Sequence, residues 1–238
     1  MAKTFKHSGD LGDIIFSLPA VRALGGGILY LDPDGGHNSP LIRTAAGQAA
    51  RTKLTAAAID SLRPLLLEQP YIQEVRSWKG QTVDYDLDQF RKHLALDNIS
   101  DSHLVPFGLA LTERDTAWLR VAKPINIEKR PVVISRSVRY QSNHLFWESN
   151  LPQLIPLAVF VGYPKEHEIF EYTFGVHVEY YPTPEVMTLA GVIAGCELFV
   201  GNSSFPHALA EAMKKPLVNE YFRVLPRTMF KREGANYV

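Results

Sequence analysis

The chain has 238 residues, with 25 basic and 25 acidic side chains and a formal net charge of zero. This balance gives no global attraction to nucleic acid or to an anionic membrane surface. A single cysteine, Cys196, excludes a framework of intrachain disulfides. No apolar run approaches the roughly 20 residues of a membrane-spanning helix, and Met1 leads directly into a predicted strand instead of a signal peptide. We therefore expect a soluble, cytoplasmic protein with one large or two small domains.

The first half of the chain alternates predicted strands and helices. Strands are expected at residues 3–7, 27–31 and 72–78, and helices at residues 12–24, 54–68 and 115–119. Turn formers fill residues 32–40, which we expect to be a loop. The pairs Lys123-Pro124 and Arg130-Pro131 frame a polar segment that we interpret as a linker between domains.

The second half repeats the same alternation. Strands are expected at residues 131–135, 157–161, 176–180, 196–200 and 216–218, and helices at residues 184–194 and 207–213. Such alternation is typical of parallel α/β folds. We predict two Rossmann-like domains, residues 1–122 and 131–238, that face each other across a cleft.

The most informative segment is the turn Gly201-Asn202-Ser203-Ser204. It follows an apolar strand and precedes an Ala-rich predicted helix. Small residues at such a turn expose backbone N–H groups, and the helix N-terminus adds the positive end of its dipole. This arrangement binds phosphate without a lysine, although an ordinary strand-to-helix turn has the same pattern.

A similar element near the N-terminus carries two carboxylates. Gly9-Asp10-Leu11-Gly12-Asp13 lies between the first predicted strand and the first predicted helix. One Asp is enough to cap a helix, so a second Asp three residues later suggests a further role. A carboxylate at a helix N-terminus stays ionised and is able to accept a proton.

These motifs resemble those of the heptosyltransferase-like glycosyltransferases of family 9, which have two Rossmann-like domains in the arrangement called GT-B. The matching segments are Gly9-Asp10-Leu11-Gly12-Asp13-Ile14-Ile15, Leu18-Pro19-Ala20-Val21-Arg22-Ala23-Leu24, Gly162-Tyr163-Pro164-Lys165-Glu166 and Gly201-Asn202-Ser203-Ser204. The chain departs from the family pattern by having Ser203 in place of an Asp and Phe205 in place of a Gly, and His207 stands one residue early. It is also short for this group, and its C-terminal motif resembles short glycosyltransferase-like proteins of phage origin.

The resemblance implies transfer of a sugar from a nucleoside-diphosphate-sugar donor to a hydroxyl acceptor. Asp13 would be the general base, with Asp10 in support. The donor-binding residues would be Arg136, Arg139, Gly162, Gly201, Asn202, Ser203, Ser204, His207 and Glu220. Backbone N–H groups of the serine turn and a basic side chain would stabilise the leaving diphosphate, and which arginine does so is left open. Glu220 would meet the donor ribose, and His207 either contacts the donor or only begins its helix.

Other features of the sequence concern the acceptor and metals. Arg43, Arg51 and Lys53 form a basic segment without acids, which is either a solvated face or a contact for an anionic acceptor. We expect a saccharide acceptor; the alternatives are hydroxymethylated bases of phage DNA, or a non-catalytic module that only binds nucleotide sugars. The Asp-x-Asp patterns at residues 32–34 and 84–88 would suit Mg²⁺, but GT-B enzymes do without one, so we assign no metal and no cofactor. The sequence does not indicate an oligomeric state.

Overall fold

A computed structural model describes residues 2–33, 38–43, 49–51, 54–94, 98–222 and 226–238. The chain divides into two compact units, Met1–Arg120 and Val121–Val238, which are described separately. The polar segment expected to be a linker lies within the second unit, where the Ile125 amide donates to the Gly191 carbonyl at 2.8 Å. Within the described ranges, no helix is both long and apolar enough to cross a membrane.

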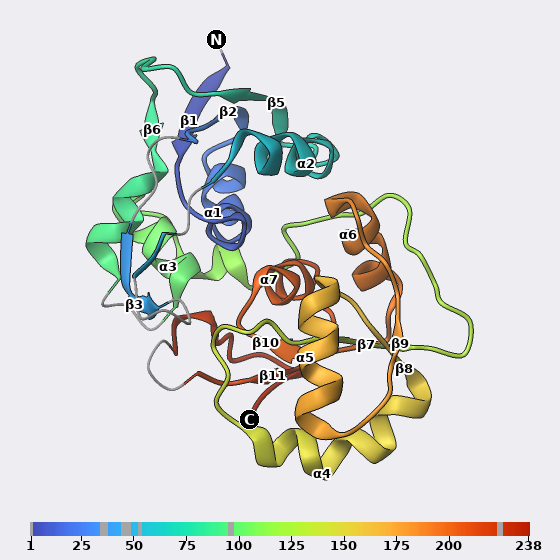
Figure 1. Ribbon diagram of the computed structural model, residues 1–238. Helices are drawn as coiled ribbons and strands as arrows, with labels where there is room; N and C mark the ends of the chain where they lie inside the picture. Colours follow the sequence, from blue (N-terminus) through green and yellow to red (C-terminus); the bar gives the residue numbers. More distant parts are fainter. Residues whose placement is uncertain (1, 34–37, 44–48, 52–53, 95–97, 223–225) are drawn as a thin grey trace. The chain divides into compact units, whose positions relative to one another are not determined.

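The first unit is built on a parallel sheet with the strand order β5-β2-β1-β6 (Figure 1). Its strands and helices are β1 (Lys3–His7), α1 (Leu11–Ala23), β2 (Gly27–Leu31), β3 (Asn38–Arg43), β4 (Ala49–Arg51), α2 (Ala56–Leu67), β5 (Ile72–Ser77), β6 (Tyr85–Asp86) and α3 (Ile99–Leu104). Short 3-10 helices follow at η1 (Leu87–His93), η2 (Val105–Phe107) and η3 (Leu111–Arg114). Strands β3 and β4 pair separately as an antiparallel hairpin.

The second unit contains a wholly parallel sheet with the order β12-β11-β10-β7-β8-β9. Its elements are β7 (Val132–Ser135), α4 (His144–Leu154), η4 (Ile155–Leu157), β8 (Ala158–Phe160), α5 (Pro164–Phe174), β9 (Glu179–Tyr180), α6 (Val186–Gly195), β10 (Leu198–Asn202), α7 (Phe205–Ala212), β11 (Leu217–Glu220), η5 (Pro226–Thr228) and β12 (Ala235–Tyr237). Two halves that each alternate strand and helix are thus confirmed as parallel α/β structure.

Helices α4 and α5 cover one face of the second sheet (Figure 1). Trp147 of α4 and Phe170 of α5 pack with Ile134, Phe160 and Val200 of the strands, all of them buried. Because side chains alternate along a strand, the neighbours of these strand residues point to the opposite face, against which α7 packs. Both faces are therefore covered, which explains why these strands are continuous apolar runs without polar alternation.

Two predicted elements are wrong. Residues 38–40 were expected to belong to a loop but begin β3; a Pro and polar residues are tolerated there because a two-stranded hairpin has open edges. No helix forms at residues 115–119. The Arg22 guanidinium binds the Ala117 carbonyl at 2.8 Å, and the Trp118 indole donates to the Ile15 carbonyl at 2.9 Å. These tertiary bonds hold the segment extended against α1.

Candidate active site

Each parallel sheet has one point at which the strand order reverses direction. In the first sheet it lies between β1 and β6, and in the second between β7 and β10. In open α/β sheets, ligands bind outside the carboxyl ends of the strands at such a switch point. The Gly9–Asp13 motif follows β1, and the Gly201–Ser204 motif begins in the last two residues of β10, so each lies at the switch point of its own sheet.

In the first unit, the segment from Gly9 to Asp13 is tightly built. Asp10 is the N-cap of α1 and forms a capping box with Asp13, in which the Asp10 amide donates to Asp13 Oδ2 at 3.2 Å. Gly9 lies so close to this carboxylate that an added Cβ would be 2.8 Å from Asp13 Oδ2 and 2.5 Å from His7 Cε1. Asp10 and Asp13 are both partly exposed residues, and both are held by the helix start.

The Asp-x-Asp pattern at residues 84–88 bonds to β1. The Asp84 carboxylate accepts from the Thr4 amide and hydroxyl, each at 2.8 Å. The Asp88 carboxylate accepts from Lys6 Nζ at 2.7 Å and from the Ser8 hydroxyl at 2.7 Å. The alternating acids therefore bond to the alternating polar residues Thr4 and Lys6 of β1 and to Ser8 just after it. Among the described residues, no group of three or more acidic, His or Cys side chains is placed to hold a metal ion.

In the second unit, Glu220 holds the loop that follows β7. Its carboxylate is fully buried and pairs with the buried Arg136 guanidinium, at 2.7 Å to Nε and 3.0 Å to the second nitrogen. It also accepts from the amides of Ser142 and Asn143 and from the Trp147 indole. Burial alone would raise the pKa of Glu220, but the hydrogen bond and charge of Arg136 and the amides of Asn143 and Ser142 together hold the pKa below its ordinary value. Glu220 and Arg136, both expected to contact the donor, are thus engaged with each other inside the unit.

Asn202 fastens the same loop from β10. The fully buried Asn202 amide accepts from the Ser137 amide at 3.0 Å and donates to the carbonyls of Ser137 and Arg139, at 2.9 and 2.6 Å. This side chain therefore acts on the protein backbone. It connects the loop after β7 to the turn after β10, which are the two segments that flank the switch point of this sheet.

The turn after β10 presents backbone and hydroxyl groups. A Cβ on Gly201 would be 2.5 Å from the Ser135 carbonyl, so only glycine allows β10 to approach β7 this closely. The Ser203 hydroxyl lies 2.8 Å from that of Thr228, and the Ser204 hydroxyl donates to the Asn202 carbonyl at 3.1 Å. Helix α7 then begins at Phe205, with Pro206 in its first turn, so its dipole points at this turn.

The turn after β8 lies beside the loop that follows β7. Gly162 has a φ of 140°, and a Cβ added to it would be 3.0 Å from Glu166 Oε2. Glu166 accepts from the Tyr163 amide at 3.1 Å, and burial raises its pKa. Arg139 interacts with Glu166 by charge, is partly exposed, and its guanidinium lies 5.4 Å from the centre of the Tyr140 ring. Of the two arginines predicted at this switch point, Arg139 is the one that solvent reaches.

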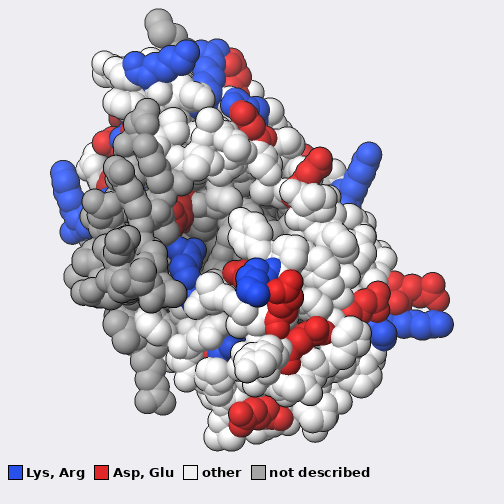
Figure 2. Space-filling view, in the orientation of Figure 1, with Lys and Arg blue, Asp and Glu red and all other residues white. Residues whose placement is uncertain are grey.

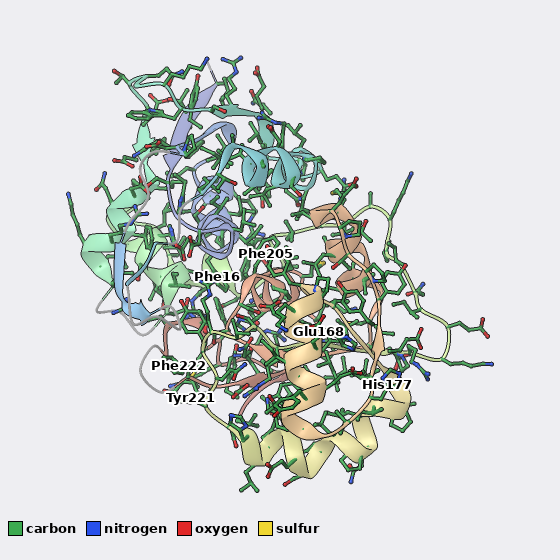
Figure 3. The ribbon with its side chains drawn as sticks, in the orientation of Figure 1. Phe16, Glu168, His177, Phe205, Tyr221 and Phe222 are labelled. Atoms are coloured by element: carbon green, nitrogen blue, oxygen red, sulfur yellow. The ribbon has the colours of Figure 1, made fainter. Side chains whose placement is uncertain are left out.

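Aromatic side chains border the loop at the end of β11. Tyr221 and Phe222 directly follow Glu220 (Figure 3). The Phe222 ring meets that of Tyr140 edge-on, with ring centres 5.6 Å apart. Tyr140 itself has a positive φ of 59°, a backbone conformation that is uncommon without glycine.

His207 and Glu211 of α7 are both fully buried. The His207 ring packs edge-on against Tyr237 of β12, with ring centres 6.2 Å apart, and burial lowers its pKa to about 3. The Glu211 carboxylate accepts from Lys214 at 2.6 Å and from Arg232 at 2.9 Å. Through Tyr237 and Arg232, both side chains are therefore buried between α7 and the C-terminal residues 232–237.

The basic segment predicted to meet the acceptor lies at the hairpin of the first unit. Arg43 ends β3 and Arg51 ends β4. Their side chains, and Lys53 altogether, lie outside the part of the chain that the structure describes. On the face shown in Figure 2, the described acidic and basic side chains are interspersed, without a broad field of one sign.

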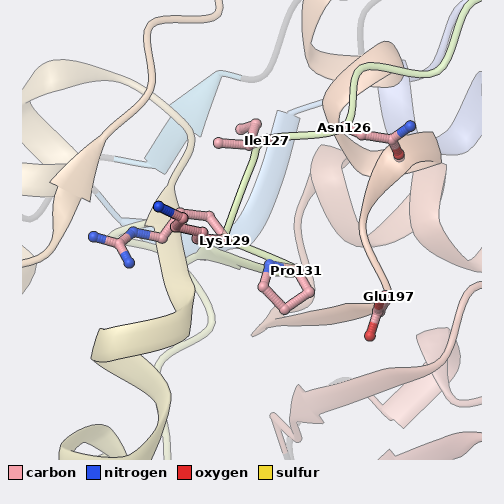
Figure 4. Close-up of a pocket in the computed structure, with 7 residues that line it drawn as sticks. Asn126, Ile127, Lys129, Pro131 and Glu197 are labelled. Carbon is pink, nitrogen blue, oxygen red and sulfur yellow. The ribbon is translucent and has the colours of Figure 1, made fainter.

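A pocket of about 320 Å³ lies elsewhere in the second unit (Figure 4). It is lined by Asn126, Ile127, Lys129, Arg130, Pro131, Gly195 and Glu197. These residues precede β7 and β10, so the pocket is at the amino ends of the strands. It is therefore separate from the switch point, which lies at the carboxyl ends.

No protein-family model and no curated protein sequence matches the chain. Solved structures do. A family 9 glycosyltransferase from Veillonella parvula superimposes with a TM-score of 0.60 and 12% identity over 99% of this chain and 84% of that one. E. coli heptosyltransferase WaaC, solved with ADP-2-deoxy-2-fluoro heptose, superimposes with a TM-score of 0.52 and 14% identity over 100% of this chain and 93% of WaaC.

The iron-containing dodecameric heptosyltransferase TibC of enterotoxigenic E. coli, in complex with ADP-D-beta-D-heptose, gives a TM-score of 0.63 and 15% identity over 98% of this chain and 61% of TibC. At such low identities the likeness concerns the fold. The chain has the fold of family 9 glycosyltransferases and heptosyltransferases, as the sequence motifs predicted.

Proposed function

We propose that this protein is a glycosyltransferase that moves a sugar from a nucleoside-diphosphate-sugar donor to a hydroxyl acceptor. The observation that carries the proposal is the construction of the second switch point. Asn202 and Glu220 lock the loop after β7 in place, beside a serine turn at the start of α7. A site with fixed backbone donors suits a diphosphate, whose charge grows as the glycosidic bond breaks. The structural relatives WaaC and TibC were solved with ADP or ADP-heptose ligands.

In this proposal the donor diphosphate binds the turn Gly201 to Ser204 and the Arg139 guanidinium. Arg139 is favoured over Arg136 because the Arg136 side chain is only 1% exposed and its charge is already neutralised by Glu220. The helix dipole and Arg139 together supply positive charge, so the reaction needs no divalent metal. Asn202, Arg136 and Glu220 act as the framework of the site without contacting the donor.

We further propose that Asp13 is the general base. The N-terminus of α1 favours the ionised carboxylate, and its bond from the Asp10 amide holds it at the switch point of the first sheet. Asp13 would take the proton of the acceptor hydroxyl while the leaving diphosphate is stabilised in the second unit. This requires the two switch points to face a common cleft, the GT-B arrangement that the resemblance implies.

A saccharide is the proposed acceptor. The net charge of zero supports it over DNA, which usually selects a basic track. Transfer to hydroxymethylated DNA is the competing outcome, and it would depend on Arg43, Arg51 and Lys53. The second competing outcome is a module that binds the donor and does not transfer its sugar.

Calorimetry with a panel of nucleoside diphosphates, beginning with ADP, tests the donor site. Binding should persist in EDTA, and Arg139→Gln should weaken it about 10- to 100-fold, the effect of losing a charge-assisted hydrogen bond. Arg130→Gln is the matched control, because Arg130 pairs with the exposed Glu179 at 3.2 Å and should change affinity little. Binding that disappears with EDTA would contradict the metal-free site, and equal effects of the two variants would remove Arg139 from it.

A further inference from the structure

Two histidines that belong to none of the motifs lie buried directly behind the Asp10–Asp13 segment. His7 ends β1 and His103 belongs to α3, and neither is exposed at all. The two Nε2 atoms are 3.1 Å apart. At one end of the pair, His103 Nδ1 is 2.9 Å from the Ile99 carbonyl oxygen. At the other end, the Gly9 amide donates to His7 Nδ1 at 2.8 Å.

These contacts allow only one placement of the protons when both rings are neutral. A carbonyl only accepts, so His103 Nδ1 carries its proton and His103 Nε2 is the acceptor. His7 Nε2 must then donate to His103, which leaves His7 Nδ1 bare to accept from Gly9. The result is a directed chain of hydrogen bonds from the Gly9 amide through both rings to the Ile99 carbonyl.

The surroundings of the pair favour the neutral rings. The Phe90 ring stacks on His103 with centres 4.2 Å apart. Burial lowers the pKa of His7 to about 4, with Arg91 and Lys6 acting in the same direction and Asp88, 3.9 Å from His7 Nδ1, acting against it. Burial also holds the pKa of His103 well below its ordinary value. A proton added to either ring would place two N–H groups against each other and break the chain.

This chain of hydrogen bonds begins at Gly9, the residue that contacts the proposed base. Gly9 is packed between the His7 ring and the Asp13 carboxylate, at distances that admit no side chain. We infer that His7 and His103 are positioning residues: through the Gly9 amide they set the placement of the Asp10–Asp13 capping box. This inference rests on the proposed function for the role of Asp13, whereas the hydrogen-bonded pair itself does not.

Nuclear magnetic resonance of the ¹⁵N-labelled full chain tests the pair without any assay of activity. We expect His7 as the Nε2–H tautomer and His103 as the Nδ1–H tautomer at pH 7. We also expect couplings across the two N–H···N bonds, from Gly9 to His7 and from His7 to His103. An imidazolium at either position, or the same tautomer at both, would overturn the inference.

Two variants of similar size then test the positioning role. His103→Gln keeps an acceptor for His7 Nε2–H, whereas His103→Leu removes it. With ADP-heptose as donor and the most effective oligosaccharide of a panel as acceptor, His103→Leu should lower kcat about 10- to 100-fold, as small misplacements of catalytic groups do. The KM for ADP-heptose should stay within about twofold, and His103→Gln should restore most of kcat. Equal losses of kcat in the two variants would show a packing role only.

The failure of the proposed function would be visible separately. If the wild type turns over no donor, Asp13 is not a base for this reaction, and the ¹³C shift of its carboxyl group then replaces kcat. That shift should change in His103→Leu and not in His103→Gln. An Asp13 shift that is the same in both variants and the wild type would overturn the positioning role.

Discussion

Glu220→Gln is the change that most sharply separates a framework role from a ligand role. Each hydrogen bond described at the Glu220 carboxylate is donated to it: Oε1 accepts from Arg136 and the amides of Ser142 and Asn143, and Oε2 from Arg136 and the Trp147 indole. A glutamine amide has one NH₂ group, which in either orientation would point at two or more donors. The buried charge of Arg136 would also lose its counterion.

The expected cost follows from that burial. The two side chains are 1% and 0% exposed, and breaking a buried ion pair by removing one partner costs about 3 to 5 kcal/mol. For a unit of this size we expect a fall in the melting temperature of roughly 10 to 20 °C. Glu179→Gln is the matched control, since it breaks the exposed pair with Arg130 and should cost less than about 1 kcal/mol.

Thermal and urea unfolding followed by circular dichroism measure both variants, and calorimetry with ADP is done where each is still folded. We expect a large loss of stability in Glu220→Gln. A Glu220→Gln protein as stable as Glu179→Gln that has nevertheless lost ADP affinity would contradict this, because Glu220 would then face the nucleotide.

The remaining predictions concern the two switch points. Gly9→Ala should lower activity and stability together, because the new methyl group would collide with His7 and Asp13; unchanged activity would contradict the tight packing. Asn202→Ala should weaken ADP binding although Asn202 itself does not contact the ligand, because the loop after β7 loses the hydrogen bonds that hold it. Wild-type affinity in calorimetry would argue against this. The depressed pKa of His7, about 4 against 6.5 in the unfolded chain, contributes stability that is complete above pH 6.5 and lost as the pH falls toward 4, about 3 kcal/mol in all. His207, with a pKa of about 3, acts in the same direction. The urea concentration at the unfolding midpoint should therefore decrease as the pH is lowered, and it should decrease less in His207→Phe than in the wild type.

The elements that could be predicted are those defined by local patterns. The apolar runs at β7 and β8 and the long helix α1 are visible in the sequence, because a strand buried on both faces is apolar and Asp10 marks the helix start. Helix α5 was missed although Pro164 stands at its first turn and Gly175 ends it in a left-handed conformation, the usual signals of the two helix ends.

The framework of the site could not be predicted, because its partners are far apart in the chain. Glu220 alone resembles a residue placed after a strand for a ribose. Only the fold brings Arg136, 84 residues earlier, to its carboxylate. His7 and His103 are likewise 96 residues apart, and neither stands in a recognisable motif. The motifs located the switch points, whereas tertiary contacts decide which polar residue holds the loop and which faces a ligand.

Whether the protein is a saccharide-dependent glycosyltransferase is decided by the release of ADP from ADP-heptose, measured with an oligosaccharide panel and with hydroxymethylated DNA as acceptors. We expect release that depends on a saccharide and falls about 10²- to 10⁴-fold in Asp13→Asn, with ADP affinity nearly unchanged. Asp10→Asn is the companion variant and should retain more activity. Near wild-type release in Asp13→Asn, or none from the wild type with any acceptor, would contradict it.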